Sequence, residues 1–226
     1  MTDLELLAPA KNIEIGIAAI DCGADAVYIA GPAFGARQAA GNSMDDLAAL
    51  CNYAHKFGAR VFMTLNTILF DDELDEAYSL MCQADDAGID AIIVQDLSVM
   101  RMADGGPDGN GRRIGIPLHA STQCAIRDSE KALFYKQLGF SRLVLERELS
   151  LQDIRKIREA TGCEIEFFIH GALCVCYSGQ CYMSECISGR SANRGECIQA
   201  CRSLYNLVDS STGKVLVRNK ALLSRT

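Results

Sequence analysis

The stretch EIGIAAIDCGADAVYIA, residues 14–30, decides the fold, because much of the remaining chain repeats its pattern. Its first half has helical period, Gly23 follows, and an unbroken apolar run occupies residues 26–30. A glycine just past a helix end adopts positive φ at little cost, and a short unbroken apolar run suits a strand buried on both faces. The stretch therefore predicts a helix followed by a strand of a parallel sheet.

The same succession occurs four more times. The later glycines are Gly58, Gly88, Gly139 and Gly162, and the apolar runs after them cover residues 61–65, 91–94, 143–145 and 165–169. Helical period marks residues 14–22, 44–57, 72–87, 129–138 and 151–160. Ser43 and Ser150 each precede early acidic residues, so we expect both serines to cap the helices that follow them.

Two further segments, residues 4–7 and 116–119, bring the predicted strands to seven. Seven strands that alternate with helices favour a parallel sheet, most economically a TIM-like (β/α)8 barrel that stops before its eighth strand. A flavodoxin-like open sheet is the alternative. The lack of a glycine-rich phosphate turn after the first strand disfavours that alternative.

Composition and charge narrow the class of protein. The chain has 226 residues and a formal net charge of −7, which suits one α/β domain and argues against strong non-specific binding of nucleic acid. It opens with Asp3 and Glu5 where a signal peptide would be basic. No stretch approaches the roughly 18 apolar residues that span a bilayer. We therefore expect a cytoplasmic protein without a membrane partner.

Polar residues stand where the predicted strands end, and in a parallel barrel that rim carries the chemistry. These residues are Asn66, Thr67, Gln95, Asp96, His119, Ser121, Thr122, Gln123, Glu146, Arg147, Glu148 and His170. Polar groups from separate strands at one rim predict a small-molecule pocket. Each of them alone is also explained as a helix cap or as a polar group at the barrel mouth.

Six of the eleven cysteines fall within 28 residues: Cys174, Cys176, Cys181, Cys186, Cys197 and Cys201. Thiols this dense in a chain without an export signal are typical of a metal site. The alternative is that they are small buried hydrophobic residues. Structural zinc sites usually contain Cys-x-x-Cys pairs, and this segment has none, which disfavours zinc. The same segment holds Arg190, Arg194 and Arg202, which form either a local basic patch or a solvated face.

The sequence predicts three parts: barrel repeats in residues 1–170, a cysteine-rich cluster segment in residues 171–203, and the start of a β-rich extension in residues 204–226. In the extension, residues 204–208 and 215–217 flank a turn and predict a hairpin. The chain stops at Thr226 within an apparent element, so we expect it to be a fragment of a longer protein.

From residue 166 the chain reads EFFIHGALCVCYSGQCYMSEC, and this segment resembles the signature of the collagenase-like U-32 peptidase family. The matching residues are Glu166, Phe168, Gly171, Cys174, Gly179, Cys181 and Ser184. Further matches are LLAPA at residues 6–10, GADAVYI at residues 23–29 and HASTQ at residues 119–123. The resemblance covers the whole chain, and it is more specific for family and fold than for substrate.

The resemblance implies a cofactor. Relatives include hydroxylases of RNA bases and of ubiquinone precursors that work with an iron–sulfur cluster and, in several cases, with prephenate as the hydroxyl donor. It implies a [4Fe–4S] cluster held by four cysteines: Cys174, Cys181, Cys197 and Cys201. The fourth ligand is open, because Cys176, Cys186 or a residue beyond the chain could replace Cys201.

The resemblance also implies a function, an oxygen-independent hydroxylase of a tRNA or rRNA base. Arg147 is then the expected partner of a small carboxylate donor, since guanidinium binds planar anions with two hydrogen bonds. His119, Glu146 and His170 are the proton-transfer candidates by position. RNA binding would need basic surface from a missing C-terminal domain or from a partner protein.

Two other functions stay open. The family name implies a peptidase, for which a His170 and Cys174 pair is conceivable, although the chain has only three histidines and no nucleophile elbow or HExxH motif. The other is a non-catalytic scaffold with a structural cluster, whose barrel mouth binds a partner enzyme.

Overall fold

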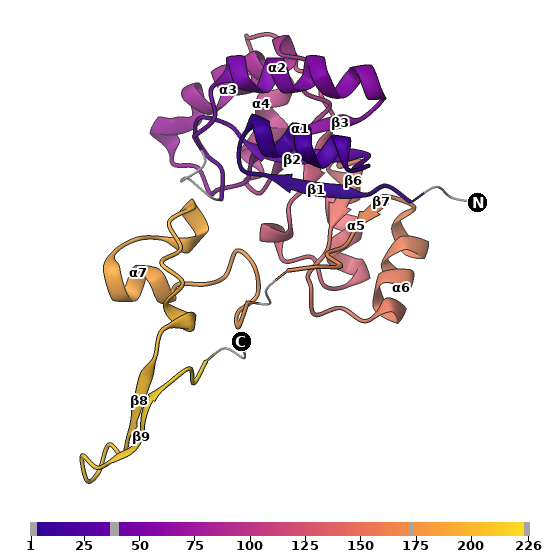
Figure 1. The fold of residues 1–226 in the computed structure, drawn as a ribbon. Helices are drawn as coiled ribbons and strands as arrows, with labels where there is room; N and C mark the ends of the chain where they lie inside the picture. The colour runs from indigo at the N-terminus through magenta and orange to yellow at the C-terminus, as the bar shows by residue number, and fades with distance from the viewer. Residues whose placement is uncertain (1–3, 37–40, 172–173, 224–226) are drawn as a thin grey trace.

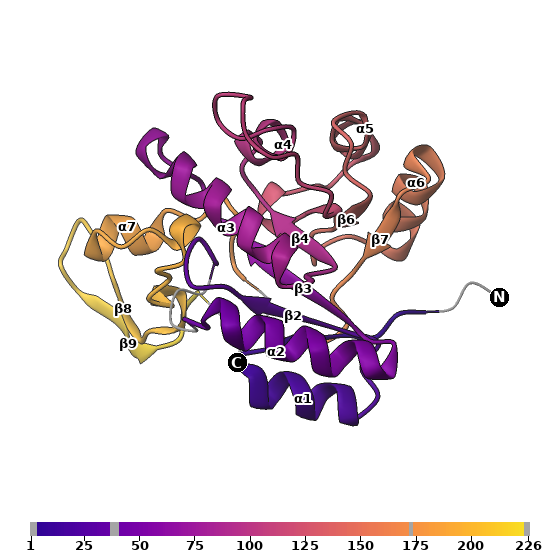
Figure 2. The same cartoon turned by 90° about the horizontal axis from the view of Figure 1, so that it is seen from above.

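The computed structural model describes residues 4–36, 41–171 and 174–223, so the predicted chain end at Thr226 lies outside the described residues. Seven parallel strands form one sheet in sequence order, and the sheet curls, with helices packed along its outer face (Figures 1 and 2). The strands are β1 Leu7–Ala10, β2 Ala26–Ala30, β3 Arg60–Leu65, β4 Ala91–Val94, β5 Leu118–Ala120, β6 Arg142–Val144 and β7 Glu164–Glu166. The helices of this part are α1 Ile13–Asp21, α2 Met44–Ala54, α3 Leu74–Asp86, α4 Ser98–Ala103, α5 Ser129–Gln137 and α6 Leu151–Thr161. Residues 4–166 are called the body below.

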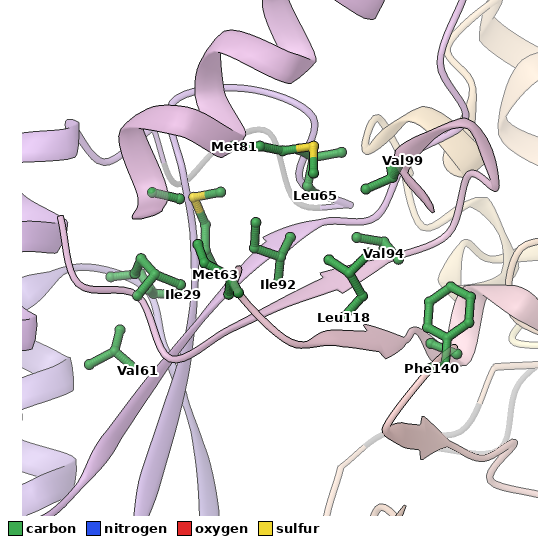
Figure 3. Close-up of a cluster of buried hydrophobic side chains, with 14 of the residues drawn as sticks. Ile29, Val61, Met63, Leu65, Met81, Ile92, Val94, Val99, Leu118 and Phe140 are labelled. Carbon is green, nitrogen blue, oxygen red and sulfur yellow. The ribbon is translucent and has the colours of Figure 1, made fainter. Parts of the chain in front are cut away.

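The body has apolar side chains on both faces of its sheet, as the unbroken apolar runs predict. The larger cluster lies between the strands and the helices, where Met63 and Ile92 pack near Met81 of α3 (Figure 3). A smaller cluster on the other face consists of four buried residues: Ala26, Phe62, Ala91 and Ile93. Burial on both faces explains why the strands read as continuous apolar runs.

The repeated unit is confirmed. All five glycines that follow the predicted helices have positive φ, from 65° at Gly162 to 102° at Gly139. Ser43 and Ser150 are N-caps, each accepting the backbone N–H three residues later. Ser43 also forms a full capping box with Asp46. Two of the other helices have caps that the pattern did not identify, Asn12 at α1 and Asp128 at α5.

Several predicted boundaries are wrong. The first strand is Leu7–Ala10 rather than residues 4–7, and it contains Pro9. A proline is tolerated there because, among the described residues, β1 pairs only with β2, which leaves one edge of β1 without ladder hydrogen bonds. The last strand ends at Glu166 rather than residue 169, so His170 lies four residues beyond it. The short helices α4 and α7, Met183–Ser188, were also not predicted.

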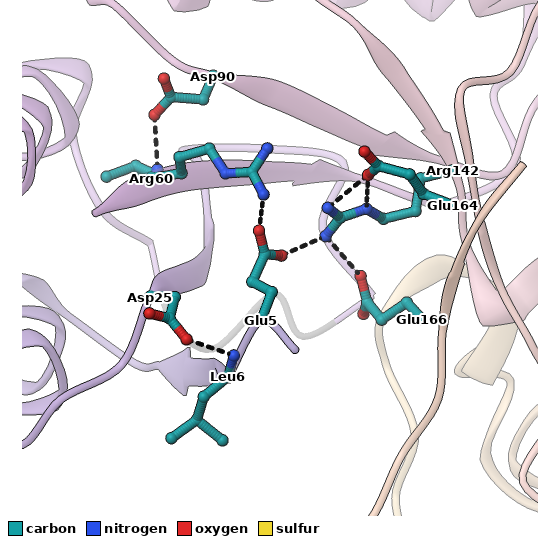
Figure 4. Close-up of polar contacts among 9 residues, drawn as sticks. Glu5, Leu6, Asp25, Arg60, Asp90, Arg142, Glu164 and Glu166 are labelled. Carbon is teal, nitrogen blue, oxygen red and sulfur yellow. Dashed lines mark hydrogen bonds and ion pairs between the residues drawn. The ribbon is translucent and has the colours of Figure 1, made fainter. Parts of the chain in front are cut away.

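The sheet is open between its two edge strands: in the described ranges, β1 pairs with β2 and β7 pairs with β6. An ionic cluster crosses this gap (Figure 4). Glu5, just before β1, pairs with Arg60 of β3 and with Arg142 of β6, whose Nη1 lies 2.5 Å from the Glu5 carboxylate. Arg142 also binds Glu164 at 2.6 Å and lies 3.7 Å from Glu166. The first and last strands are thus linked by side chains instead of by a strand.

Residues 174–223, called the C-terminal segment below, contain α7, short 3-10 turns and the predicted hairpin. The hairpin strands, β8 Tyr205–Val208 and β9 Val215–Lys220, are antiparallel and project away from the body (Figure 1). Among the helices that the structure describes, none is both long and apolar enough to cross a membrane.

Candidate functional site

The polar residues after β6 meet the C-terminal segment at the carboxyl ends of the strands. Glu146 is 1 % exposed, and its Oε2 accepts a hydrogen bond of 3.5 Å from the backbone N–H of Ser178. Its Oε1 has no hydrogen-bond partner among the described residues. Burial, and next the charge of Glu148, raises the pKa of Glu146 to about 7. A carboxyl group with such a pKa is able to accept or donate a proton near neutral pH.

Arg147 lies next to the cysteine-rich segment. Its guanidinium stacks 4.0 Å from the centroid of the Phe168 ring, and Nη1 lies 4.0 Å from Sγ of Cys174. Its Nε is buried without a hydrogen-bond partner among the described residues. A buried guanidinium N–H that the protein leaves unsatisfied is suited to an anionic ligand.

The turn at residues 177–180 fits closely over the strand ends. Arg127 stacks on the ring of Tyr177 at 4.0 Å. Gly179 has a φ of 73°, and a Cβ there would lie 1.9 Å from the carbonyl oxygen of Gln123 and 3.1 Å from Nε2 of Gln95. Only glycine permits both the conformation and the approach. The turn therefore places Ser178 at Glu146, and its neighbour Gly179 at the ends of β4 and β5.

A pocket of about 440 Å³, open to solvent, lies next to this turn, which contributes Gly179 and Gln180 to its lining. Its lining includes Gln95, Asp96, Gln123, Lys131 and Gln180. Three of these, Gln95, Asp96 and Gln123, are among the strand-end residues that the sequence predicts for a small-molecule pocket. Lys131 of α5 and Gln180 were not predicted, because neither follows a strand.

Two histidine candidates lie apart from this arrangement. His119 is 4 % exposed, with its ring edge against Phe62 at a centroid distance of 5.0 Å. Burial, and next the charge of Arg142, lowers the pKa of His119 to about 3, so the ring is neutral at neutral pH. His170 is exposed beyond the end of β7. The structure thus brings Glu146 to Ser178 and Arg147 to Cys174, and it places the two histidines elsewhere.

None of the six clustered cysteines is buried, which excludes their interpretation as small core residues. Cys197 Sγ accepts hydrogen bonds from the Gln199 N–H at 3.4 Å and from the Ser184 hydroxyl at 3.9 Å. Burial raises the pKa of Cys176, and the neighbouring Cys181 and Cys174 raise it further. N–H and O–H donors aimed at sulfur are typical around metal-bound thiolates.

The positions of these side chains do not yet form a metal site. Within residues 4–36, 41–171 and 174–223, no three His, Cys, Asp or Glu side chains are grouped in a way that could hold a metal ion. The thiols and their hydrogen-bond donors fit a thiolate-bound cluster in kind. Binding of a metal would have to draw them together, as in small metal sites where folding accompanies binding.

Arg190 and Arg194 of the cysteine-rich segment each bind a carboxylate, so the three arginines predicted there do not form one free basic patch. Arg194 binds both carboxylate oxygens of Glu73 and donates to the carbonyl of Ile68 at 2.6 Å. It also stacks 4.1 Å from the centre of the Phe70 ring. Arg190 pairs with Glu196 at 3.8 Å. Arg194 therefore fastens the segment to the loop after β3, a contact that no local pattern indicates because the two residues are 121 positions apart.

Comparison with known proteins gives the family. The model of peptidase family U32 matches residues 11–225 of the chain. The chain belongs to this U32 family.

Two curated relatives of this U32 chain have names that refer to the modification of RNA. It is 54 % identical over 221 residues to the 23S rRNA 5-hydroxycytidine C2501 synthase of Escherichia coli K12, a match that covers 98 % of this chain and 32 % of the relative. It is 37 % identical over 206 residues to the tRNA hydroxylation protein P1 of Bacillus subtilis 168, covering 90 % of this chain and 47 % of that protein. The U32 chain thus spans a third to a half of the length of these relatives.

A solved U32 peptidase structure shares the fold with a TM-score of 0.61 at 14 % identity, over 76 % of this chain and 71 % of that one. Two residues of the U32 signature quoted above have structural reasons in this chain. Gly179 permits the close turn over Gln123, and Ser184 is buried, where its hydroxyl links the Ile198 N–H at 3.2 Å to Cys197.

Proposed function

We propose that this chain is the sheet-and-cluster part of an RNA-modifying enzyme, an oxygen-independent hydroxylase of an rRNA or tRNA base. The observation that carries the proposal is the 54 % identity, across 98 % of the chain, to an enzyme named for 5-hydroxycytidine synthesis in 23S rRNA. The second relative, named for tRNA hydroxylation, supports the same reaction on another RNA. The sheet itself is, in this proposal, most of a (β/α)8 barrel.

The proposed cofactor is a [4Fe–4S] cluster held by Cys174, Cys181, Cys197 and Cys201. Support comes from the density of thiols, their exposure, and the hydrogen-bond donors that face Cys174 and Cys197. When bound, such a cluster would supply a site for one-electron transfer beside the strand ends. Cys176 and Cys186 are the alternatives to Cys201 as fourth ligand.

The residues of the chain have separate roles in this proposal. Arg147 binds a carboxylate of the hydroxyl donor, for which prephenate is the candidate, because its guanidinium lies next to Cys174 and has a buried Nε–H without a partner among the described residues. Glu146 holds or releases a proton, because its pKa lies near 7. Ser178 positions Glu146 through its backbone N–H. His119 stays neutral and packs against Phe62, so its role is structural.

The first experiment measures iron and acid-labile sulfide, with electron paramagnetic resonance spectra, on protein purified without oxygen. About four irons per chain are expected in the wild type and in Cys22→Ala, an exposed cysteine of α1's C-terminus that serves as the control. Cys181→Ala should lose the cluster. Stoichiometric zinc, or the same iron content in Cys181→Ala, would contradict the cofactor assignment.

The reaction is tested by nucleoside mass spectrometry of RNA incubated with the protein under argon and, separately, under ¹⁸O₂. A hydroxylated nucleoside that forms under argon, needs the carboxylate donor and is lost in Arg147→Ala is the expected result. Incorporation of ¹⁸O from dioxygen would contradict oxygen independence.

Proteolysis is the second candidate function, and the family description is what favours it. A cysteine peptidase needs a thiolate held by a histidine. Among the described residues, His119 contacts Phe62 and His55 pairs with Asp90, and no hydrogen bond joins a histidine to a cysteine. Cleavage of gelatin by the iron-loaded protein, abolished by Cys174→Ala, would restore this candidate. The scaffold function remains a prediction that loss of partner binding in rim variants would support.

A further inference from the structure

The pocket between the ends of β4 and β5 has unsatisfied polar groups that the proposed reaction does not use. Gln95 Oε1 is buried without a hydrogen-bond partner among the described residues. Lys131, half-buried on the first turn of α5, has no carboxylate within ion-pair distance in the same residues. Among the lysines that the structure describes, Lys131 alone is half-buried. Its position in a pocket indicates an anionic ligand.

The acid in the pocket does not serve as the partner of this lysine. Asp96 lines the pocket, but its Oδ2 accepts from the Leu69 N–H at 3.0 Å and its Oδ1 from the Ser98 N–H at 2.9 Å. Its carboxylate is thus held by two backbone amides. The polar side chains that remain to contact a ligand include the amides of Gln95, Gln123 and Gln180, able to pair with a hydrogen-bonding edge, and the Lys131 ammonium, able to pair with an anion.

The pocket also has apolar walls. Ile68 and Leu97, which follow β3 and β4, both line it and are 38 % and 40 % exposed. Exposed aliphatic side chains beside an amide and a cation suit a flat ring that carries an anionic substituent. A nucleobase has a flat face that packs against aliphatic side chains and an edge with hydrogen-bonding groups. Glutamine pairs with base edges through two hydrogen bonds. A volume of about 440 Å³ falls within the ordinary range for small-molecule pockets.

We infer that this pocket holds one unpaired nucleotide of RNA, with its base between Ile68 and Leu97, its hydrogen-bonding edge at Gln95 and its phosphate at Lys131. The choice of RNA as the source of the nucleotide rests on the proposed function. The turn at residues 177–180 borders both sites: Ser178 contacts Glu146, and Gly179 and Gln180 line the pocket. One turn would therefore contact both the nucleotide and Glu146.

Binding is measured by NMR titration or calorimetry with cytidine 5′-monophosphate, uridine 5′-monophosphate, cytidine and inorganic phosphate, on the full chain. Lys131→Met should weaken binding of the monophosphates about tenfold, the usual effect of losing one hydrogen bond to a charged group. It should leave cytidine unchanged, because cytidine has no phosphate. Lys136→Met, on the last turn of the same helix, is the matched control and should change neither.

Gln95→Glu tests the base edge. It keeps the shape of the side chain but removes the amide donor and adds a negative charge. It should therefore weaken cytidine, and it should weaken cytidine monophosphate more, because the charge also repels the phosphate. Circular dichroism confirms that each variant is folded. Equal binding of the monophosphates by wild type, Lys131→Met and Gln95→Glu would overturn the assignment, and so would phosphate binding as tightly as the nucleotides, which would indicate a simple anion site.

Titration with a short single-stranded oligoribonucleotide shows whether the pocket takes its nucleotide from RNA or binds the free nucleotide. Tighter binding of the oligomer than of the monophosphate, weakened by Lys131→Met, supports RNA as the source. Binding of the monophosphate without the oligomer would overturn it. These titrations need neither iron nor turnover. Nucleotide binding without hydroxylation would therefore count against the proposed function alone. Hydroxylation without nucleotide binding at the pocket would count against the pocket alone.

Discussion

The body and the C-terminal segment differ in what holds them together. The body buries a continuous set of apolar side chains between its strands and its helices. In the described part of the C-terminal segment, three side chains are buried, namely Ser184, Asn193 and Ala200. Leu204, Leu207 and Leu216 of the hairpin region remain exposed. The body thus contains its own core, whereas the segment depends on polar contacts and, in our proposal, on its cysteines.

The contacts that hold the segment are few and are directed at the body. Arg194 binds Glu73 and the Ile68 carbonyl, and the Ser178 amide binds Glu146. In our proposal, the sheet fixes the position of the site, and metal binding in the segment completes it. The five predictions below test this difference, from the largest expected effect to the smallest.

Removing the metal should affect the segment and spare the body. Cys181→Ala, or chelation of iron from the wild type, should abolish hydrogen-exchange protection in residues 174–203, because structural metal sites supply on the order of 10 kcal/mol to the segments that they fold. Protection in β2, β3 and β4 should not change. Equal protection of the segment with and without iron would show that the segment is held by its protein contacts alone.

Breaking the ionic cluster should affect the body. Arg142→Met leaves Glu5, Glu164 and Glu166 without their shared partner, and removal of one member of a buried charge network costs about 3–5 kcal/mol. Urea unfolding of the body measures the loss. Arg155→Met, an exposed residue of α6, is the control and should cost less than about 1 kcal/mol.

The stability of the body should also depend on pH through Glu166. Burial raises the pKa of Glu166 to about 7, above its unfolded value, so the folded state binds the proton more tightly. This contribution is complete below pH 4.5 and is lost as the pH rises to about 7. It amounts to about 3 kcal/mol at most, at 1.36 kcal/mol per pKa unit. The free energy of unfolding of the wild type relative to Glu166→Gln should therefore fall between these pH values, and a constant difference would refute the assignment.

Loosening the segment from the body should have a smaller effect. Arg194→Ala removes two hydrogen bonds to Glu73, and hydrogen bonds to charged groups contribute about 1.5–3 kcal/mol each at most sites. Because the pair is partly exposed, we expect about 2 kcal/mol, seen as faster hydrogen exchange in residues 190–203. Arg190→Ala, which loses only a pair of 3.8 Å, is the comparison variant. Similar exchange in both variants would show that the contact with Glu73 does not hold the segment.

The smallest effect concerns a helix cap in the body. Ser150→Ala removes the hydroxyl that accepts the Asp153 N–H at 3.2 Å, at a cost of about 1 kcal/mol. The unfolding temperature of the body should fall, while the hydrogen-exchange pattern of the C-terminal segment should stay the same. Gln152→Ala, an exposed change on the same helix, should leave the unfolding temperature nearly unaltered.

The sequence by itself determined the local elements of this protein. Helix ends with glycine, apolar runs and serine caps depend on neighbouring residues only, so residues 14–30 and their repeats predicted the order of strands and helices. The hairpin and the cysteine-rich segment were found in the same way. The ends of the strands were harder to predict from the sequence. The bounds of β1, which contains Pro9, and of β7, which ends at Glu166, depend on the position of both strands at the edges of the sheet.

Only the tertiary structure decided which polar residues meet. His119 and Glu146 are both candidates for proton transfer at strand ends, yet His119 lies inside β5 and packs against Phe62, whereas Glu146 lies beyond β6 and faces the Ser178 amide. Adjacent residues of a strand point to opposite faces of the sheet, so a boundary shift of one residue changes the neighbours of each side chain. The pairing of Glu5 with Arg142, 137 residues apart, likewise arises because the curling of the sheet brings its two edges together.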